Sequence, residues 1–125
     1  MRVGIVGSRH GVATEEVERF VDRLAKQHPD AIVVSGRAAG VDRVAEEAAI
    51  MCGLEVEVYP ADWKNGGKLA GKQRNWQLVS ACDVVVAFWD GWSNGTAHSV
   101  TAATALGKRV WVYAPPAPVR SQASE

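Results

Sequence analysis

Short apolar runs alternate with longer amphipathic stretches along most of the chain. Five of the runs have the length and the Val, Ile and aromatic content of strands, and they cover residues 3–6, 31–34, 54–59, 84–88 and 109–113. Between them, apolar residues recur at the spacing of one buried helical stripe. This spacing predicts four helices. The first starts at Thr14, the second runs from Val44 and ends at Gly53, and the other two span residues 72–82 and 96–106.

The regular alternation of strand and helix predicts an α/β fold. Right-handed crossovers then give a Rossmann-like, doubly wound, parallel five-stranded sheet in the order 3-2-1-4-5, with helices on both faces. The third run alternates apolar residues with Glu55 and Glu57, which indicates a half-exposed strand at a sheet edge. The fourth run is the most apolar and should lie centrally, and Trp76 and Val79 should point from the third helix into the core.

Glycine-bearing turns follow four of the predicted strands. They are Gly7-Ser8-Arg9 and the segments 35–42, 66–71 and 90–96. In a parallel sheet such turns gather at the carboxyl edge, where backbone N–H groups and helix N-termini meet a ligand. The sequence therefore predicts a nucleotide or phosphate site at this edge.

Arginines, small polar residues and glycines of these turns and the adjoining helices are the predicted ligand contacts. Guanidinium groups pair with phosphate, and glycines let the backbone approach it closely. Each contact also has a structural alternative: an exposed arginine after a tight turn, a helix-starting role for Asp42, or a structural hydrogen bond for His98. The predicted contacts are Gly7, Ser8, Arg9, Ser35, Gly36, Arg37, Gly40, Asp42, Arg74, Asn75, Asp90, Gly91, Ser93, Gly95, Thr96 and His98.

The charge balance refines this picture. Fourteen basic and fourteen acidic residues among 125 leave no net charge, which argues against a general nucleic-acid or membrane binder. The basic residues nevertheless cluster near the turns, as suits a small anionic ligand. Trp63 or Trp92 is a candidate to stack on a base.

Several classes of site are disfavoured. Cys52 and Cys82 have no metal-ligand spacing and are expected to be reduced core thiols, so neither a metal nor a cofactor is predicted. No Gly-Lys-Ser/Thr follows the second turn, which argues against a Walker-type ATPase. Residues 91–95 match a nucleophile elbow, but the required order of Ser, acid and His is absent.

The ends of the chain and one long link complete the organisation. Residues 1–113 are predicted to be one nucleotide-binding domain, and the Pro-rich segment 114–125 a disordered tail. The segment 60–71 is long for a connector, which favours a functional loop or lid. Without a signal-peptide or membrane-spanning pattern, we expect a cytoplasmic protein with no membrane partner.

Taken together, Gly7-Ser8-Arg9, the turn 35–42, the stretch 70–75 and the segment 88–98 resemble the SLOG superfamily over residues 1–113. The chain most resembles its small, mostly uncharacterised bacterial and phage members. Relatives include the Smf/DprA DNA-processing proteins, the cytokinin-activating LOG phosphoribohydrolases and nucleotide-sensing domains. The resemblance implies a Rossmann-like sheet, a nucleotide-derived ligand and a homodimer.

Two departures from the family pattern shape the functional hypotheses. Ser99 stands where the phosphoribohydrolases carry a catalytic glutamate, and Arg37 replaces the second glycine of a Ser-Gly-Gly turn. The first hypothesis is therefore binding of an AMP-like or ADP-ribose-like ligand, as a sensor or carrier. The alternative is an enzyme that cleaves N-glycosidic bonds of nucleotides, with Asp42 or Asp90 as its carboxylate. Binding of single-stranded DNA is a weaker alternative.

Overall fold

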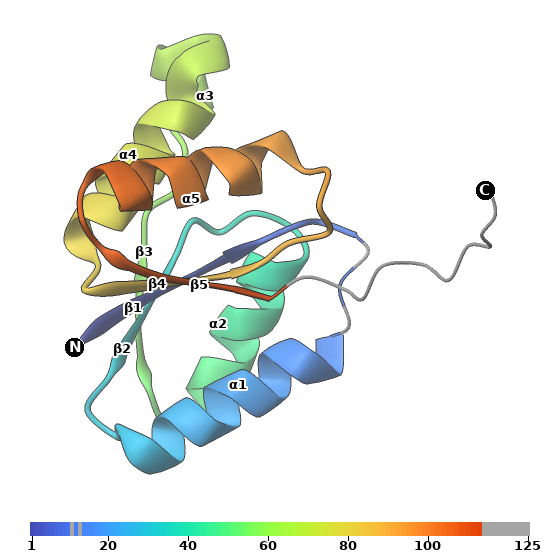
Figure 1. The fold of residues 1–125 in the computed structure, drawn as a ribbon, viewed down its shortest axis with the longest axis vertical. Helices are drawn as coiled ribbons and strands as arrows, with labels where there is room; N and C mark the ends of the chain where they lie inside the picture. The colour runs from blue at the N-terminus through green and yellow to red at the C-terminus, as the bar shows by residue number, and fades with distance from the viewer. Residues whose placement is uncertain (11, 13, 114–125) are drawn as a thin grey trace, which may run out of the picture.

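Five parallel strands form the single sheet of the computed structural model, which describes residues 1–10, 12 and 14–113 (Figure 1). The order is β3-β2-β1-β4-β5, as the alternation of strands and helices predicted. The strands are β1 (Arg2–Gly7), β2 (Ile32–Ser35), β3 (Glu55–Val58), β4 (Val84–Phe88) and β5 (Arg109–Tyr113). The half-exposed strand β3 lies at one edge, and β4 lies inside the sheet next to the central strand β1.

Helices cover both faces of the sheet. They are α1 (Thr14–Gln27), α2 (Val41–Met51), α3 (Trp63–Gly66), the 3-10 helix η1 (Gly67–Leu69), α4 (Ala70–Ala81) and α5 (Asn94–Ala105). One core lies under α1 and α2, and a second under α4 and α5 on the opposite face (Figure 1). This is the doubly wound arrangement.

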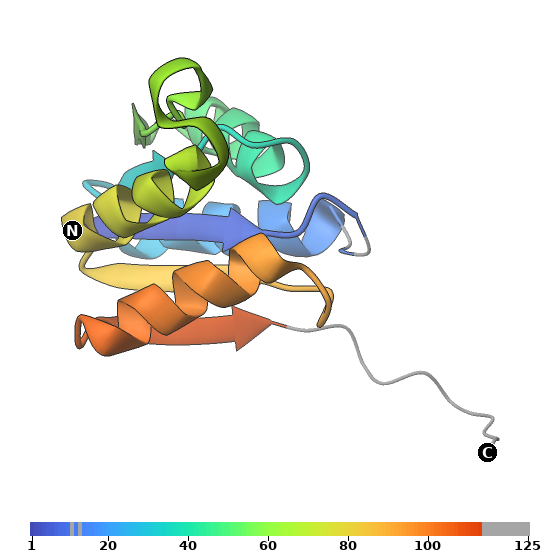
Figure 2. The same cartoon turned by 90° about the horizontal axis from the view of Figure 1, so that it is seen from above.

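The strands all point the same way, so the turns after them meet at one edge (Figure 2). Close backbone packing holds these turns together. Gly40 has a φ of 82°, and a Cβ there would lie 2.5 Å from the Cα of Arg9. A Cβ at Gly7 would lie 2.5 Å from the carbonyl oxygen of Phe88. Glycine is therefore required at position 40, where the turns after β1 and β2 approach each other, and at position 7, where the end of β1 passes the end of β4.

The segment 60–71, expected as a loop or lid, is mostly helical. It forms α3, η1 and the first turn of α4. Asp62 starts α3, because its side chain accepts a hydrogen bond from N of Asn65 at 3.3 Å. The sequence signal missed here was this cap, which lies directly before Trp63.

Two predictions about burial were wrong. Val79 is fully buried as predicted, but Trp76 is 41% exposed and packs edge-on against His98 with ring centroids 6.3 Å apart. Cys82 is buried, whereas Cys52 is exposed just after α2 and is not a core thiol. Cys52 is the residue that follows the last turn of α2, whereas Trp76 lies in the middle of α4, where its ring packs against His98 of α5 instead of entering the core.

Residues 114–125, predicted to be a disordered tail, lie outside the described residues. Among the helices of the described ranges, none has the length and apolar character needed to cross a bilayer.

Candidate functional site

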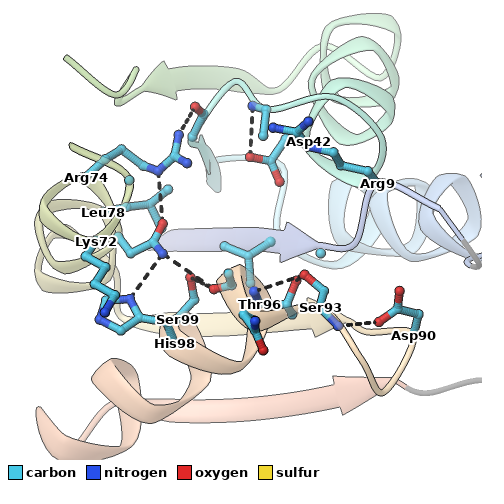
Figure 3. Close-up of a pocket in the computed structure, with 18 of the residues that line it drawn as sticks. Arg9, Asp42, Lys72, Arg74, Leu78, Asp90, Ser93, Thr96, His98 and Ser99 are labelled. Atoms are coloured by element: carbon cyan, nitrogen blue, oxygen red, sulfur yellow. Dashed lines mark hydrogen bonds between the residues drawn. The ribbon is translucent and has the colours of Figure 1, made fainter. Parts of the chain in front are cut away.

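A pocket of about 510 Å³ opens at the carboxyl edge of the sheet, between α4 and the turns after β1, β2 and β4 (Figure 3). Eleven of the sixteen predicted contacts line it: Gly7, Arg9, Gly36, Asp42, Arg74, Asn75, Asp90, Ser93, Gly95, Thr96 and His98. This size and lining suit a small-molecule ligand. The structure thus brings together residues that are as many as 91 positions apart, from Gly7 to His98.

The N-terminus of α5 forms one wall of the pocket. Ser93 caps the helix: its Oγ accepts a hydrogen bond from N of Thr96 at 3.4 Å and lies 3.2 Å from Oγ1 of Thr96. The N–H groups of Asn94 and Gly95 precede the first intrahelical bond, so the helix itself gives them no acceptor. This end of the pocket therefore offers backbone donors and the positive end of a helix dipole to an anion.

Asp90 shapes the turn before α5. Its Oδ1 accepts hydrogen bonds from the N atoms of Trp92 and Ser93, both at 2.8 Å. These bonds hold the pKa of the Asp90 carboxyl below its ordinary value. The N atom of Asp90 in turn donates to Oγ of Ser8 at 3.0 Å, so the buried Ser8 joins the turns after β1 and β4 beneath the pocket.

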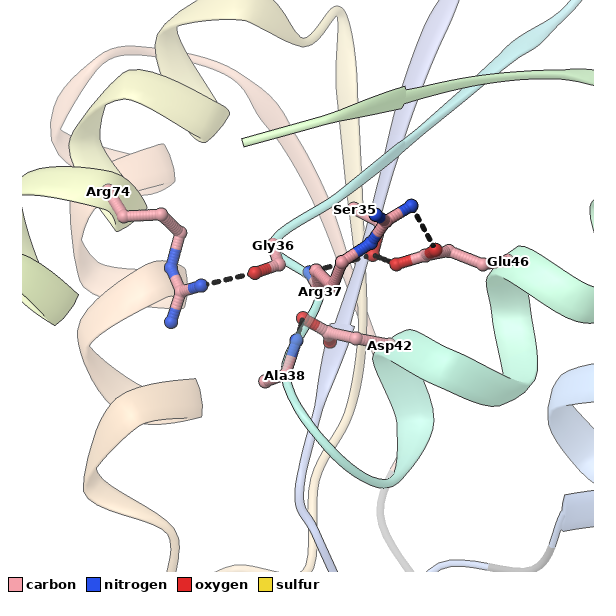
Figure 4. Close-up of polar contacts among 7 residues, drawn as sticks. All are labelled: Ser35, Gly36, Arg37, Ala38, Asp42, Glu46 and Arg74. Carbon is pink, nitrogen blue, oxygen red and sulfur yellow. Dashed lines mark hydrogen bonds and ion pairs between the residues drawn. The ribbon is translucent and has the colours of Figure 1, made fainter. Parts of the chain in front are cut away.

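Arg74 connects α4 to the turn after β2 (Figures 3 and 4). Its Nε donates to Oδ1 of Asn75 at 2.9 Å, and its Nη1 donates to the carbonyl oxygen of Gly36. A Cβ at Gly36 would lie 2.8 Å from that Nη1, so a larger residue would displace the guanidinium. Because α4 begins at Ala70, Arg74 lies beyond the first helical turn, and Lys72 is the cation that opposes the helix dipole.

Asn75 of α4 and His98 of α5 form a hydrogen-bonded pair that joins the two helices beside the pocket. Asn75 accepts from Arg74 with Oδ1, so its Nδ2 is the donor toward Nδ1 of His98 at 3.2 Å and toward the carbonyl oxygen of Gly95 at 3.4 Å. Burial, with a smaller effect from Lys72, lowers the pKa of His98. A neutral imidazole that accepts at Nδ1 carries its proton on Nε2, which makes that nitrogen a hydrogen-bond donor.

Asp42 is the buried carboxylate of the site. Its side chain lines the pocket although the residue is only 5% exposed, and its Oδ2 accepts a hydrogen bond from N of Ala38 at 3.2 Å (Figure 4). Burial raises the pKa of Asp42 to about 6, against the opposing effects of that hydrogen bond and of the nearby Arg74. It does not cap α2, whose first turn it occupies.

Five predicted contacts do not line the pocket: Ser8, Ser35, Arg37, Gly40 and Gly91. Ser35 and Arg37 are held by Glu46 of α2 instead (Figure 4). Oγ of Ser35 donates to Oε2 of Glu46 at 2.6 Å, and Nη2 of Arg37 donates to Oε1 at 3.1 Å. Arg37 has a φ of 56°, which aims its side chain away from Arg74. Gly40 and Gly91 serve the backbone, with φ of 82° and 90°.

Several pocket residues were not among the predicted contacts. Gly71 and Leu78 lie on the same face of α4 as Asn75, at the i, i+4, i+7 spacing that a helix beginning at Ala70 would have revealed. The cations Lys68 and Lys72 also line the pocket. The remaining lining residues are Val6, His10, Ala38, Trp63, Asn94 and Ser99.

The two tryptophans considered for stacking differ in position. Trp63 lines the pocket and packs over Gly71, where a Cβ would lie 3.2 Å from its ring. Trp92 is 87% exposed and does not line the pocket. Ser99, which stands in place of a glutamate, donates from Oγ to the carbonyl oxygen of Gly95 at 3.3 Å. Within residues 1–10, 12 and 14–113, no group of three or more His, Cys, Asp or Glu is placed to hold a metal ion.

Solved structures share this fold. DNA processing protein A from Helicobacter pylori, solved for its single-stranded DNA binding mode, is 23% identical with a TM-score of 0.73, over 96% of this chain and 67% of that one. The structural genomics target TM1055 is 25% identical with a TM-score of 0.70, over 87% and 71% of the two chains. DprA from Streptococcus pneumoniae is 20% identical with a TM-score of 0.75, over 95% of this chain and about half, 51%, of that one.

Sequence comparisons place the chain more narrowly. The Gene 61 protein of Mycobacterium phage D29 is 37% identical over 113 residues, which is 85% of this chain and 90% of that protein. The family model of the YspA, cpYpsA-related SLOG family matches residues 1–66, the half that carries the turns after β1 and β2. With the parallel sheet and the glycine-lined carboxyl edge in place, the chain belongs to the YspA, cpYpsA-related SLOG family.

Proposed function

We propose that the pocket binds a nucleotide or nucleotide-derived phosphorylated ligand of the AMP or ADP-ribose type, as a sensor or carrier. The observation that carries the proposal is the meeting of the α5 N-terminus with an excess of positive charge in one pocket. Four cations line it against two carboxylates: Arg9, Lys68, Lys72 and Arg74 against Asp42 and Asp90. Backbone donors, a helix dipole and guanidinium groups together favour a phosphate.

The test is calorimetric titration with AMP and ADP-ribose. Arg74→Ala should weaken binding by about 10- to 100-fold, the range for losing hydrogen bonds to a charged group. Because Arg74 also donates to Gly36, Lys72→Ala serves as a second variant that leaves this contact in place. Arg19→Ala, which removes an exposed cation of α1, is the matched control. Unchanged affinity in both pocket variants would contradict the proposal.

Asp42 favours a second candidate function, cleavage of the N-glycosidic bond of a nucleoside 5′-monophosphate. Between the two carboxylates considered for this role, Asp90 is committed to the N atoms of Trp92 and Ser93. Asp42 is buried in the pocket, and its pKa of about 6 suits a general acid or base near neutral pH. Chromatography of a nucleotide panel should then show free base, and Asp42→Asn should abolish its release. No release at high protein concentration removes this candidate.

Exposed tryptophans beside lysines favour a third candidate, binding of single-stranded DNA, which is the activity named for the Helicobacter pylori structure. Trp63 and Trp76 are 59% and 41% exposed, and Lys64 and Lys68 lie on the same helical segment. Such groups stack on bases and contact backbone phosphates. A salt-sensitive gel shift with a single strand would support this candidate, and the absence of a shift at low salt would remove it.

A homodimer is part of the proposal, and the edge strand β5 supports it. Its large apolar residues Trp111, Val112 and Tyr113 are 55%, 46% and 41% exposed, next to backbone edge groups that no second strand of residues 1–10, 12 and 14–113 pairs. A second copy would cover this edge. Sedimentation equilibrium should report a dimer that Trp111→Lys dissociates, whereas a monomeric wild-type protein would contradict the arrangement.

A further inference from the structure

The two carboxylates of the pocket differ in what they can offer a ligand. Asp90 is half-buried and uses Oδ1 for two hydrogen bonds within its own turn. Asp42 lines the pocket and is only 5% exposed. Among the described residues, N of Ala38 donates a hydrogen bond to its Oδ2 at 3.2 Å, and the N–H of Gly36 is a weaker donor that also lowers the pKa of this carboxyl. A carboxylate has about four acceptor sites, so these two donors leave part of its capacity unused.

A buried carboxylate with few hydrogen-bond donors is costly. Charged and polar groups that leave water lose hydration free energy unless a partner replaces the water. Arg74 is near Asp42 and attracts it, but its guanidinium donates to Gly36 and Asn75. Glu46, on the next turn of α2, repels the Asp42 charge. The structure therefore keeps an acceptor at this place that its own described groups only partly satisfy, which points to a ligand that brings hydrogen-bond donors.

The ends of the pocket have opposite requirements. The α5 N-terminus offers N–H donors and favours an anion, whereas Asp42 repels an anion and accepts from a hydroxyl group. Asp42 follows β2 and α5 follows β4, and these strands flank β1. The two ends of the pocket therefore belong to turns on either side of β1.

A ribose 5′-phosphate meets these requirements. Its phosphate is an anion, and its 2′- and 3′-hydroxyl groups form a vicinal pair of donors at the other end of the sugar. One carboxylate can accept from both hydroxyl groups, a pairing known from ribose recognition in dinucleotide sites of other α/β folds. A 2′-deoxyribose offers one donor fewer.

We infer that Asp42 is a specificity-determining residue: it accepts hydrogen bonds from the 2′- and 3′-hydroxyl groups of a ribose whose 5′-phosphate lies at the N-terminus of α5, so that the site selects ribonucleotides over deoxyribonucleotides. The inference rests on the proposed nucleotide site and adds the direction in which the ligand lies. The same contact should make the site select nucleotides whose 2′- and 3′-hydroxyl groups both carry no substituent.

The experiment compares matched ligands. The four ribonucleoside 5′-monophosphates are titrated calorimetrically into the full chain, each against its 2′-deoxy counterpart. The deoxy ligand should bind about 10- to 100-fold more weakly, because a buried acceptor is left unpaired. Asp42→Asn, which keeps the shape but loses the charge and one acceptor, should bring the two affinities to within a few fold. Asp22→Asn, the same change at an exposed position of α1, should leave the ratio as in the wild type.

The titrations distinguish a wrong role for Asp42 from a pocket that binds no nucleotide. Equal affinity of the wild type for the ribo and deoxy ligands, with both weakened by Lys72→Ala, overturns the role of Asp42 and leaves the nucleotide site standing. A ratio that persists in Asp42→Asn also overturns it. If none of the eight ligands binds at millimolar concentration, the nucleotide site and the role of Asp42 fall together.

Discussion

Replacing Asp42 by Asn should remove a loss of stability that the unliganded wild-type protein shows as the pH rises toward neutral. Burial raises the pKa of Asp42 from its ordinary 3.8 to about 6 in the folded protein. The folded state therefore holds the Asp42 proton at pH values where the unfolded state has released it. The stability of the wild type should fall as the pH rises between these two values, because ionisation favours the unfolded chain.

The magnitude follows from the gap between the two pKa values. The whole gap corresponds to about 3 kcal/mol at about 1.4 kcal/mol per pKa unit, and about 2 kcal/mol of the free energy of unfolding is lost between pH 4 and pH 6, with little more above it. Asn has no such titration. The difference in stability between Asp42→Asn and the wild type should therefore grow by about 2 kcal/mol from pH 4 to pH 7.

Urea unfolding followed by circular dichroism at pH 4, 5, 6, 7 and 8 measures this difference. Only its change with pH is diagnostic, because the hydrogen bond to Ala38 can differ between Asp and Asn by a constant amount. Asp22→Asn, at an exposed ion pair of α1, controls for the loss of one carboxylate. A difference that stays level across the series, or that shrinks toward pH 7, would refute the reasoning that Asp42 is destabilised by burial.

Two further predictions concern the scaffold. Gly40→Ala should lower the free energy of unfolding by more than Gly53→Ala. At both positions φ is positive, which strains an alanine by about 1 kcal/mol, but of the two only a Cβ at position 40 meets backbone atoms within 3 Å. Equal losses in urea unfolding would contradict the close packing of the turns. Cys52 should react promptly with a thiol reagent, whereas burial raises the pKa of Cys82 to about 12 and should protect it until unfolding. Two fast-reacting thiols in the native protein would show that Cys82 is accessible.

The fold followed from the sequence because strand and helix patterns in this chain are regular and uninterrupted. The alternation of Glu55 and Glu57 with apolar residues marked β3 as an edge strand, which it is. Helix starts were harder to predict. α4 begins two residues before the predicted Lys72, because Ala70 and Gly71 continue the helical segment that Asp62 initiates.

The position of the candidate site was also predictable, since turns after parallel strands share an edge whatever their sequences. The direction of each side chain was not. Arg37 follows the same turn as Gly36, yet its positive φ and the carboxylate of Glu46, nine residues away, hold it outside the pocket. Ser8 and Ser35 have the residue type of phosphate contacts but are buried: Ser8 accepts a hydrogen bond from N of Asp90 in the turn after β4, and Ser35 donates one to Glu46 of α2. The direction of these side chains depends on residues that are distant in the sequence, and a local sequence pattern does not identify them.

The place of Trp63 gives the protein a built-in optical reporter. Of the five tryptophans in the sequence, all within the described residues, Trp63 is the one whose indole lines the pocket, where it lies over Gly71. Its emission depends on the polarity around the ring, so a variant with Phe at the other four positions would signal occupancy through a single fluorophore. Unlabelled compounds could then be screened against the pocket before its natural ligand is identified.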